Sequence, residues 1–423
     1  MSTSPPPLPL RAIPVNQPQF RWLNVYAFDP SLSSQLEYMG LNRVSMRVPW
    51  ESDETTGQDA LAAGPAGEYL EVVDVDPASG CFYAPVDLNQ PYLLATDGLQ
   101  PSEGNPQFHQ QMVYAVAMTT IGYFERALGR RALWSPRRWK EGGEGGNWHE
   151  EYVRRLRIYP HALREANAYY SPDKKALLLG YFPAPTTDIA SHLPGGMVFT
   201  CLSHDVIAHE TTHALLDGMH RRFIKPTNPD ALAFHEAFAD IVALFQHFSL
   251  PEVLRNQIAK TRGDLASENL LAQLAQEFGQ ATGLHGALRD ALGGSDPSSG
   301  RWETATADPA LIQSVMEPHA RGSILVAAVF DAFLTIYKSR TADLLRIATG
   351  GSGVLPQGQL HPDLVNRLAD EAAKTAQHVL TICIRALDYC PPVDVYFGDY
   401  LRAVITSDYD LVRDDDLSYR VTL

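Results

Sequence analysis

The sequence predicts an α+β protein of two lobes, a β-rich N-terminal lobe followed by a mainly helical C-terminal lobe. The chain has 423 residues, more than one hydrophobic core usually holds. Its first half contains β-rich stretches at 69–76 and 86–94, bounded by turn-forming proline and glycine segments. From Ser203 onward the apolar residues recur mostly with helical spacing. We expect a flexible proline-rich arm over 1–20, an N-terminal α+β lobe over 21–200 and a helical lobe over 201–423.

Local patterns place individual elements of the N-terminal lobe. Apolar residues between Phe108 and Tyr123 fall on one helical face, so a long helix is expected to begin just after Pro106. The glycine-rich segment 141–146 is predicted as a surface loop. Segments 154–159 and 175–182 are predicted as strands.

Capping signals divide the C-terminal lobe into helices. Ser203 and Gly218 are expected to flank the first helix, as N-cap and C′ residue. Asn228 and the following proline are expected to open the second helix. Further helices are expected to begin at Pro251, Ser267, Pro318 and Pro362. The apolar run 324–337 is interrupted by an aspartate and is too short for a membrane span, so we expect a buried helix.

Charge and the N-terminal sequence restrict the class of partner. The net charge of −15 disfavours nucleic acid and anionic membranes, because both require an excess of lysine and arginine. Residues 1–18 are polar and proline-rich and do not resemble a secretory signal. We therefore expect a cytoplasmic protein, with unconventional export left open.

The four cysteines do not suggest a disulfide framework. Cys383 and Cys390 are seven positions apart in a helical pattern, about 10 Å by helical rise, which is too far for a disulfide unless the helix ends early. Cys81 and Cys201 are interpreted as small buried apolar residues.

Residues 209–213 read His-Glu-Thr-Thr-His, which is the HExxH pattern. Histidines four positions apart on a helix share one face, so His209 and His213 can reach one metal ion. Glu210 then lies beside the open position of the metal, where a carboxylate can take a proton from a bound water. This pattern is typical of metal-assisted hydrolysis.

A second acidic pattern supports a zinc site. Residues 235–240 read His-Glu-Ala-Phe-Ala-Asp in a second helical segment. Glu236 is the expected third ligand. Asp240 lies one turn further along the same face and could accept the free N–H of a ligand histidine. We expect one Zn²⁺ per chain. The alternative is two ordinary amphipathic helices with solvated carboxylates.

Other zinc arrangements can be compared with the same residues. The metzincin pattern requires Gly and His three and six positions after His213, where this chain has Leu216 and Met219, so that class is excluded. His220 is a rival third ligand, but Gly218 is expected to end the helix before it.

The chain resembles a known family at several motifs. The stretch 205–214, Asp-Val-Ile-Ala-His-Glu-Thr-Thr-His-Ala, followed by 236–240, resembles the thermolysin-like gluzincin metallopeptidases. Segment 167–171, Asn-Ala-Tyr-Tyr-Ser, is similar to the substrate-binding edge strand of that family. Segment 319–324, His-Ala-Arg-Gly-Ser-Ile, is similar to the segment that carries its oxyanion-stabilising histidine. The resemblance, from about residue 106 to 338, implies a zincin-like fold with zinc in the cleft between the lobes.

The resemblance also implies roles for single residues in a zinc-dependent peptidase. Glu210 would act as general base and His319 would stabilise the oxyanion. Asn167 and Ala168 would hold the backbone of a peptide or protein substrate. Arg289 matches an arginine that binds a substrate carbonyl, although a surface arginine on a helix is an equal alternative.

Some positions depart from the family pattern. The family has a tyrosine between its two zinc helices as a second oxyanion donor, but this chain has no tyrosine from 182 through 336. His220, Arg221 and Arg222 lie in the corresponding connection and could replace the tyrosine as oxyanion donor. The alternative is that this connection is a plain surface loop and none of them has that role. His235 stands where thermolysin has an asparagine and could orient His213.

The calcium pattern of the family is incomplete. Asp205 matches a calcium-binding aspartate, but His247 stands where another acidic ligand is expected. We therefore expect no calcium site of the family type, and interpret Asp205 as an anion favouring the first turn of its helix.

Three functions remain open from the sequence. The first is a zinc endopeptidase. The second is a zinc aminopeptidase, since residues 195–197, Gly-Gly-Met, are similar to part of that group's motif, although Val198 replaces its glutamate. The third is a non-catalytic, zinc-containing peptide-binding protein, which the missing tyrosine favours and an intact Glu210 disfavours. The oligomeric state is not indicated.

Overall fold

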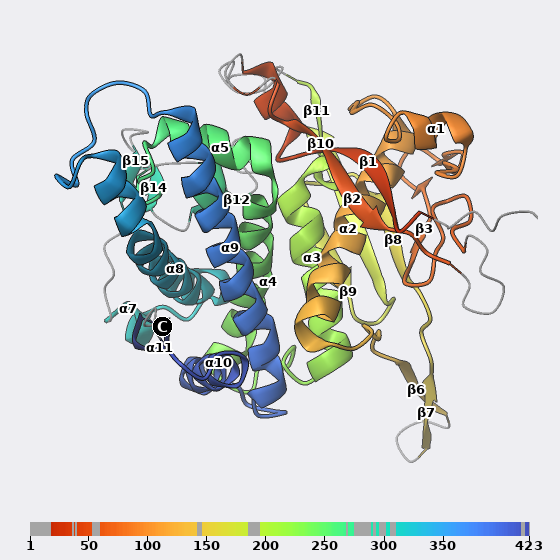
Figure 1. The fold of residues 1–423 in the computed structure, drawn as a ribbon. Coiled ribbons are helices and arrows are strands. Elements are labelled where there is room, and N and C mark those ends of the chain that lie inside the picture. The colour runs from red at the N-terminus through yellow and green to blue at the C-terminus, as the bar shows by residue number, and fades with distance from the viewer. Residues whose placement is uncertain are drawn as a thin grey trace, which may run out of the picture.

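The computed structural model describes most of the chain. The described residues are 18–35, 38, 40–52, 60–141, 146–184, 195–267, 270–274, 289–290, 293–295, 302–304, 310–415 and 419–422. The predicted arm over 1–20 and the loop over 141–146 therefore lie largely outside them. Within them the chain is α+β, with strands concentrated in the N-terminal half and helices in the C-terminal half, as predicted (Figure 1).

The strands belong to several small sheets. They are β1 Phe20–Tyr26, β2 Arg43–Pro49, β3 Leu70–Val72, β4 Val75–Asp76, β5 Cys81–Phe82, β6 Arg137–Glu141, β7 Asn147–Glu151, β8 Leu156–Leu163, β9 Ala168–Ser171, β10 Ala176–Pro183, β11 Met197–Phe199, β12 Gln273–Leu274, β13 Arg289–Asp290, β14 Gly293–Ser295 and β15 Trp302–Thr304. The main sheet has the order β11-β10-β8-β3, and β9 pairs with β10. β8 lies parallel to β10 and β3, while β9 and β11 are antiparallel to β10.

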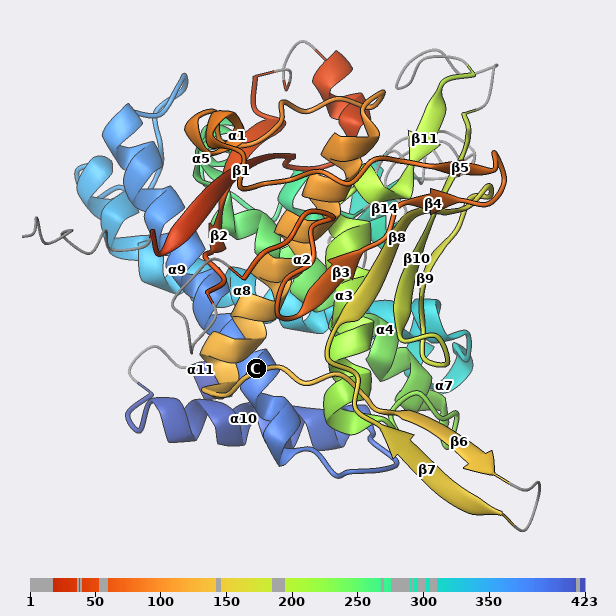
Figure 2. The same ribbon diagram turned by 90° about the vertical axis from the view of Figure 1, so that its right-hand side faces the viewer.

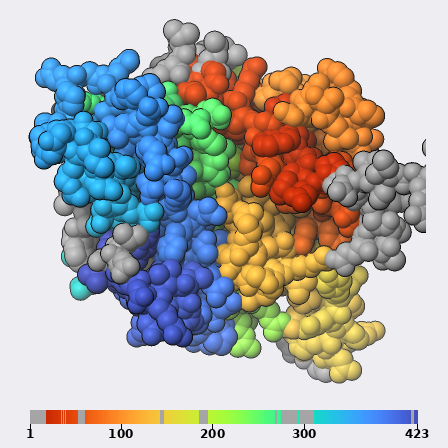
Figure 3. All heavy atoms as spheres, viewed as in Figure 1, coloured from red at the N-terminus to blue at the C-terminus, as the bar shows by residue number. Residues whose placement is uncertain are grey.

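The helices make up most of the rest. They are α1 Pro91–Ala95, α2 Pro106–Leu128, α3 His204–His220, α4 Pro229–Gln246, α5 Pro251–Lys260, α7 Leu311–Ser314, α8 Pro318–Ala348, α9 Pro362–Ala386, α10 Phe397–Leu411 and α11 Tyr419–Thr422. Helices α2, α3 and α4 stand between the main sheet on one side and α8, α9 and α10 on the other (Figures 1 and 2). In the space-filling view the C-terminal half lies on the left of the molecule and the N-terminal half on the right (Figure 3).

The two halves share one core. Buried apolar side chains from Leu23 through Tyr419 form one continuous cluster, in which α2 has buried residues around most of its circumference. Among the described residues the core is continuous from one half to the other, because α2, α3 and α4 join the halves through buried contacts. The helices that carry the candidate site lie at this junction.

Proline and asparagine signals placed most helix starts correctly. α2, α5, α8 and α9 each begin at the predicted proline. Asn228 caps α4 as predicted, since its side-chain oxygen accepts the N–H groups of Asp230 at 2.8 Å and Ala231 at 3.0 Å. Ser203 occupies the N-cap position of α3, but its hydroxyl makes no capping hydrogen bond.

Three local predictions were wrong. Segment 86–94 contains the start of α1 at Pro91 instead of a strand. Near Ser267, where a helix was expected, the described residues form a short 3₁₀ turn, Leu270–Ala272, followed by β12. Gly218 was expected just after the end of α3 but lies inside it, where a Cβ would collide with the backbone carbonyl of Leu133. Glycine is therefore required there for close packing, and α3 continues to His220.

Helix α8 contains the long apolar run. By length and composition alone this 31-residue helix could cross a membrane. The sequence argument, which considered only the run 324–337, therefore underestimated the length of the apolar helix. In this fold 56% of its most apolar window is buried. Phe330, Phe333 and Tyr337 on its inner face pack in the common core, as in the core helix of a globular domain.

Candidate metal centre

Helix α3 places the HExxH side chains at the junction of the two halves. His209, Glu210 and His213 are 6%, 7% and 8% exposed, so the motif faces the interior and is not a solvated surface pattern. One ligand atom from each of the three lies within 4.8 Å of the others. The side chains therefore converge, as helical spacing predicts.

Helix α4 adds Glu236 to this group. Its Oε2 atom lies 3.3 Å from His209 Nε2 and 3.5 Å from His213 Nε2. In a tetrahedral zinc site with bonds of about 2.0–2.1 Å, neighbouring ligand atoms lie roughly 3.3 Å apart. The separations of 3.3 and 3.5 Å are close to this distance between ligand atoms, so these two imidazoles and this carboxylate fit one zinc ion.

Glu210 and Glu236 both lie near the histidines, and their partners distinguish them. The Oε2 of Glu236 faces both imidazole Nε2 atoms. Glu210 instead accepts the backbone N–H of Tyr170 through its Oε2 at 2.7 Å. We therefore assign Glu236 as the candidate ligand and leave Glu210 beside the site.

The imidazoles determine the charge state of Glu236. Burial alone would raise the pKa of this carboxyl, but His213 and hydrogen bonds from His209, His213 and His319 together lower it far below the ordinary glutamate range. Glu236 is therefore ionised, which is the form that binds a metal.

Asp240 contacts the histidine that it was expected to support. Its Oδ1 lies 2.8 Å from His209 Nδ1. A carboxylate that accepts this N–H would leave the Nε2 lone pair free for a metal ion once no proton occupies Nε2.

His235 contacts His213 differently from the prediction. The two rings stack, with centroids 4.5 Å apart and an angle of 18° between them. The Nδ1 of His213 and the Nε2 of His235 have no hydrogen-bond partner among the described residues. His235 therefore contacts His213 through its ring face and does not accept its N–H, because stacked rings cannot aim their in-plane nitrogens at each other.

The predicted edge strand lies against α3 and is fixed to it at two points. Besides the N–H bond to Glu210, the Tyr170 hydroxyl donates to Asp217 at 2.8 Å, and Lys175 Nζ lies 2.7 Å from the same carboxylate. β9 pairs with β10 on its other side. Tyr170 was not singled out from the sequence, although it lies in the same segment as Asn167.

Backbone alternation indicates which groups of β9 face the site. The Tyr170 N–H points to Glu210, away from β10. In an antiparallel strand the residue two positions earlier points its backbone groups to the same side, so the carbonyl of Ala168 faces that edge too. Asn167 is exposed, and its side-chain oxygen accepts the Ala168 N–H at 2.9 Å. Gly180 of β10 permits this approach, because a Cβ there would collide with the Asn167 carbonyl.

Helix α8 brings His319 to the candidate ligand group. His319 Nε2 lies 3.2 Å from Glu236 Oε2, and its side chain is 52% exposed, so it borders both the ligand group and solvent. Arg321 Nε donates to Asp230 of α4 at 2.7 Å, which ties the two helix starts together. Gly322 allows them to pack closely, since a Cβ there would lie 2.8 Å from the Ala233 carbonyl oxygen.

Arg289 is described only in its backbone. It lies in β13, paired with Leu274 of β12, so the alternative interpretation of a helical surface arginine is wrong. Its side chain lies outside the described part of the chain, and the substrate-binding role stays a prediction.

Three more of the predicted residues, His220, Arg221 and Asp205, have structural partners. His220 Nε2 lies 2.9 Å from the carbonyl of Leu387, so it is not a third ligand and does not replace the tyrosine. Arg221 lies 4.0 Å from Glu150 of β7. Asp205, in the first turn of α3, is bonded by His247 at 2.5 Å.

The four cysteines are free. Cys383, Cys390 and Cys201 are buried, but Cys81 is exposed on β5, so its prediction as a buried residue was wrong. Strand β5 has only two residues, and the short hairpin that it forms with β4 is too small to bury Cys81.

Comparisons with known proteins give no further guide. No protein-family model matches the chain, and no curated protein matches it. The functional argument therefore depends on these residues and their geometry.

Proposed function

We propose that this protein is a zinc-dependent peptidase with a zincin-like fold, of the thermolysin-like gluzincin class, and that it favours internal peptide bonds. The observation that carries the proposal is the ligand group of His209, His213 and Glu236, with imidazole-to-carboxylate separations of 3.3 and 3.5 Å. A bound Zn²⁺ would polarise the scissile carbonyl and lower the pKa of a water molecule.

Glu210 is suited to move the proton. The Tyr170 N–H holds one carboxylate oxygen at 2.7 Å, which leaves the other oxygen to accept a proton from the attacking water. The same carboxyl can then pass the proton to the leaving amine. At 7% exposure the group is shielded, so its electrostatic effect on the reacting atoms is stronger than in bulk water.

β9 is suited to bind an extended peptide. A peptide added along its outer edge would donate to the carbonyl of Ala168 and receive a hydrogen bond from the Asn167 amide group. Main-chain bonding of this kind demands little of the substrate sequence. It also places the peptide next to Glu210, because the Tyr170 N–H on the same edge already reaches that carboxylate.

Asn167→Ala is expected to lower kcat/KM for peptides without loss of zinc. Removing one substrate hydrogen bond costs about 0.5–1.5 kcal/mol, which corresponds to roughly twofold to tenfold. Steady-state kinetics with zinc analysis of the same samples would test this. Unchanged kinetics would place Asn167 in an ordinary turn.

His319→Ala is expected to reduce kcat by about 10²–10³ while zinc is retained, because an oxyanion donor acts on the transition state. His361→Ala, at the exposed N-cap of α9, is the matched control and should leave kcat unchanged. Full activity of the His319 variant would remove this residue from the mechanism.

One assay separates this proposal from the alternatives. Quenched peptides with blocked and free N-termini are incubated with the protein, with and without a chelator. Cleavage of blocked peptides supports an endopeptidase. Cleavage confined to free N-termini would indicate an aminopeptidase, and binding without cleavage would indicate a non-catalytic peptide-binding protein.

A further inference from the structure

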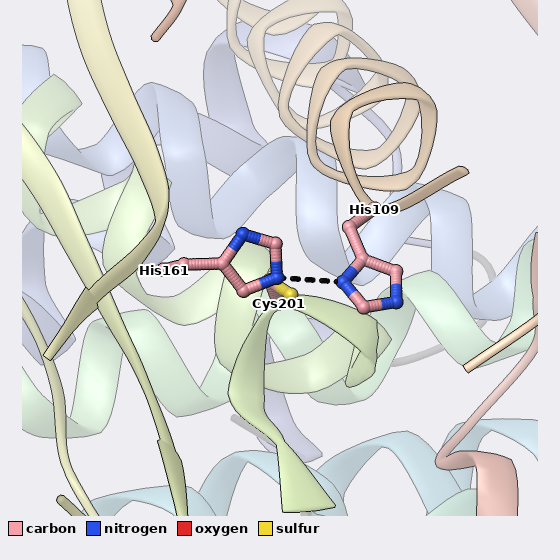
Figure 4. A group of neighbouring side chains, drawn as sticks. All are labelled: His109, His161 and Cys201. Carbon is pink, nitrogen blue, oxygen red and sulfur yellow. Dashed lines mark hydrogen bonds between the residues drawn. The ribbon is translucent and has the colours of Figure 1, made fainter. Parts of the chain in front are cut away.

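A second group of metal-binding side chains lies outside the α3–α4 site. It consists of His109 on α2, His161 on β8 and Cys201 in the turn before α3, at 1%, 3% and 0% exposure. One ligand atom from each lies within 4.8 Å of the others. In Figure 4 the sulfur of Cys201 lies beside the line that joins the two ring nitrogens.

The hydrogen bonds of the two rings constrain their protons. His109 Nδ1 and His161 Nε2 face each other at 2.8 Å. Their other nitrogens both face acceptors: His161 Nδ1 lies 2.6 Å from the Asp74 carboxylate, and His109 Nε2 lies 2.9 Å from the Glu103 carbonyl. Each outer nitrogen must therefore carry a hydrogen. The inner nitrogens then present two lone pairs to each other unless a cation lies between them.

That cation is either one additional proton or a metal ion, and the surroundings suit a metal. Histidines that bind metals donate their other N–H to a carboxylate or a backbone carbonyl, and these rings have one of each. Asp74 is 3% exposed, and its second oxygen accepts from Gln110 Nε2 at 3.0 Å. The carboxylate is thus held in the orientation that supports His161 as a ligand.

We propose that His109, His161 and Cys201 form a second Zn²⁺ site. Imidazole and thiolate are both preferred zinc ligands, and a water molecule would complete four-coordination. When the metal binds, the Cys201 thiol releases its proton to solvent. A proton shared between the two imidazole rings, where one is present, is released in the same way. The two inner nitrogens must separate from 2.8 Å to roughly 3.3 Å, a shift of about half an ångström.

This site would hold the fold together at the start of the catalytic helix. Its ligands come from α2, from the main sheet and from Thr200–Leu202, which directly precedes α3. It shares no ligand with the α3–α4 site, so it goes beyond the proposed peptidase function and does not depend on it.

Cobalt distinguishes the two sites, because only the second contains sulfur. The full chain is produced with Co²⁺ in place of zinc. Bound cobalt should then give a thiolate-to-metal charge-transfer absorption in the near ultraviolet. Cys201→Ala should abolish this band and remove one metal ion per chain. Cys383→Ala, which changes another cysteine with 0% exposure, is the matched control and should retain both.

The parent protein alone can overturn the proposal. Absence of the charge-transfer band from cobalt-containing parent protein would show that no thiolate binds the metal, whether or not the variants fold. Persistence of the band in Cys201→Ala would assign it to another cysteine. His209→Ala should keep the band, so loss of the peptidase site and loss of this site give different results.

Discussion

Glu210→Gln is expected to reduce peptide turnover by about 10²–10⁴, the usual contribution of general acid–base catalysis. Glutamine keeps the size and helix propensity of glutamate, and its side-chain oxygen can still accept the Tyr170 N–H that bonds Glu210 at 2.7 Å. It cannot take a proton from water. Zinc content and thermal stability should therefore persist while kcat falls, as measured by steady-state kinetics, elemental analysis and thermal unfolding of the same preparation.

Two controls make this result specific. Glu252→Gln makes the same change at an exposed residue in the first turn of α5 and should leave turnover unchanged. In the double variant with His319→Ala, the two losses should not simply multiply, because both residues act on one tetrahedral species. A Glu210 variant as active as the parent would make the hydrolytic mechanism untenable.

Loss of a zinc ligand is expected to have the other large effect. His209→Ala and Glu236→Ala each remove one of the three proposed protein ligands, so the protein should lose one zinc ion per chain on dialysis, together with the proposed peptidase activity. Asp240→Ala leaves the ligands in place but removes the carboxylate 2.8 Å from His209 Nδ1. Metal affinity should then fall by about 10–100-fold.

His220→Ala is the control for this series. This histidine lies on the same helix but contacts the Leu387 carbonyl at 2.9 Å. Its removal should leave zinc content unchanged. Stoichiometric retention of zinc at the α3–α4 site by His209→Ala would mean that the ligand assignment is incorrect.

Local sequence signals predicted the helix that carries each ligand, because capping and periodicity act within a few residues. Asn228 and Pro229 begin α4 as expected, which places Glu236 opposite α3. Gly218 was misinterpreted, since its requirement comes from the Leu133 carbonyl, a residue far away in the sequence. Close packing between elements has no local signature.

Contacts between distant segments explain what could not be predicted at the sites. The bond from Tyr170 to Glu210 joins a strand to a helix, and no spacing rule connects them. The same holds for His109, His161 and Cys201. One signal was present: residues 109–111 read His-Gln-Gln and are followed by a mainly apolar stretch of the helix, and all three side chains are buried. Buried polar side chains require partners, which marks this part of α2 as a site to examine.

The most direct test of zinc-dependent hydrolysis is cleavage of a blocked peptide library by the parent protein before chelation, after chelation and after Zn²⁺ is restored, with products identified by mass. The account predicts cleavage at internal bonds that disappears with the chelator and returns with zinc. Absence of cleavage by protein with the α3–α4 site loaded, or cleavage that persists after zinc is removed from that site, would contradict it.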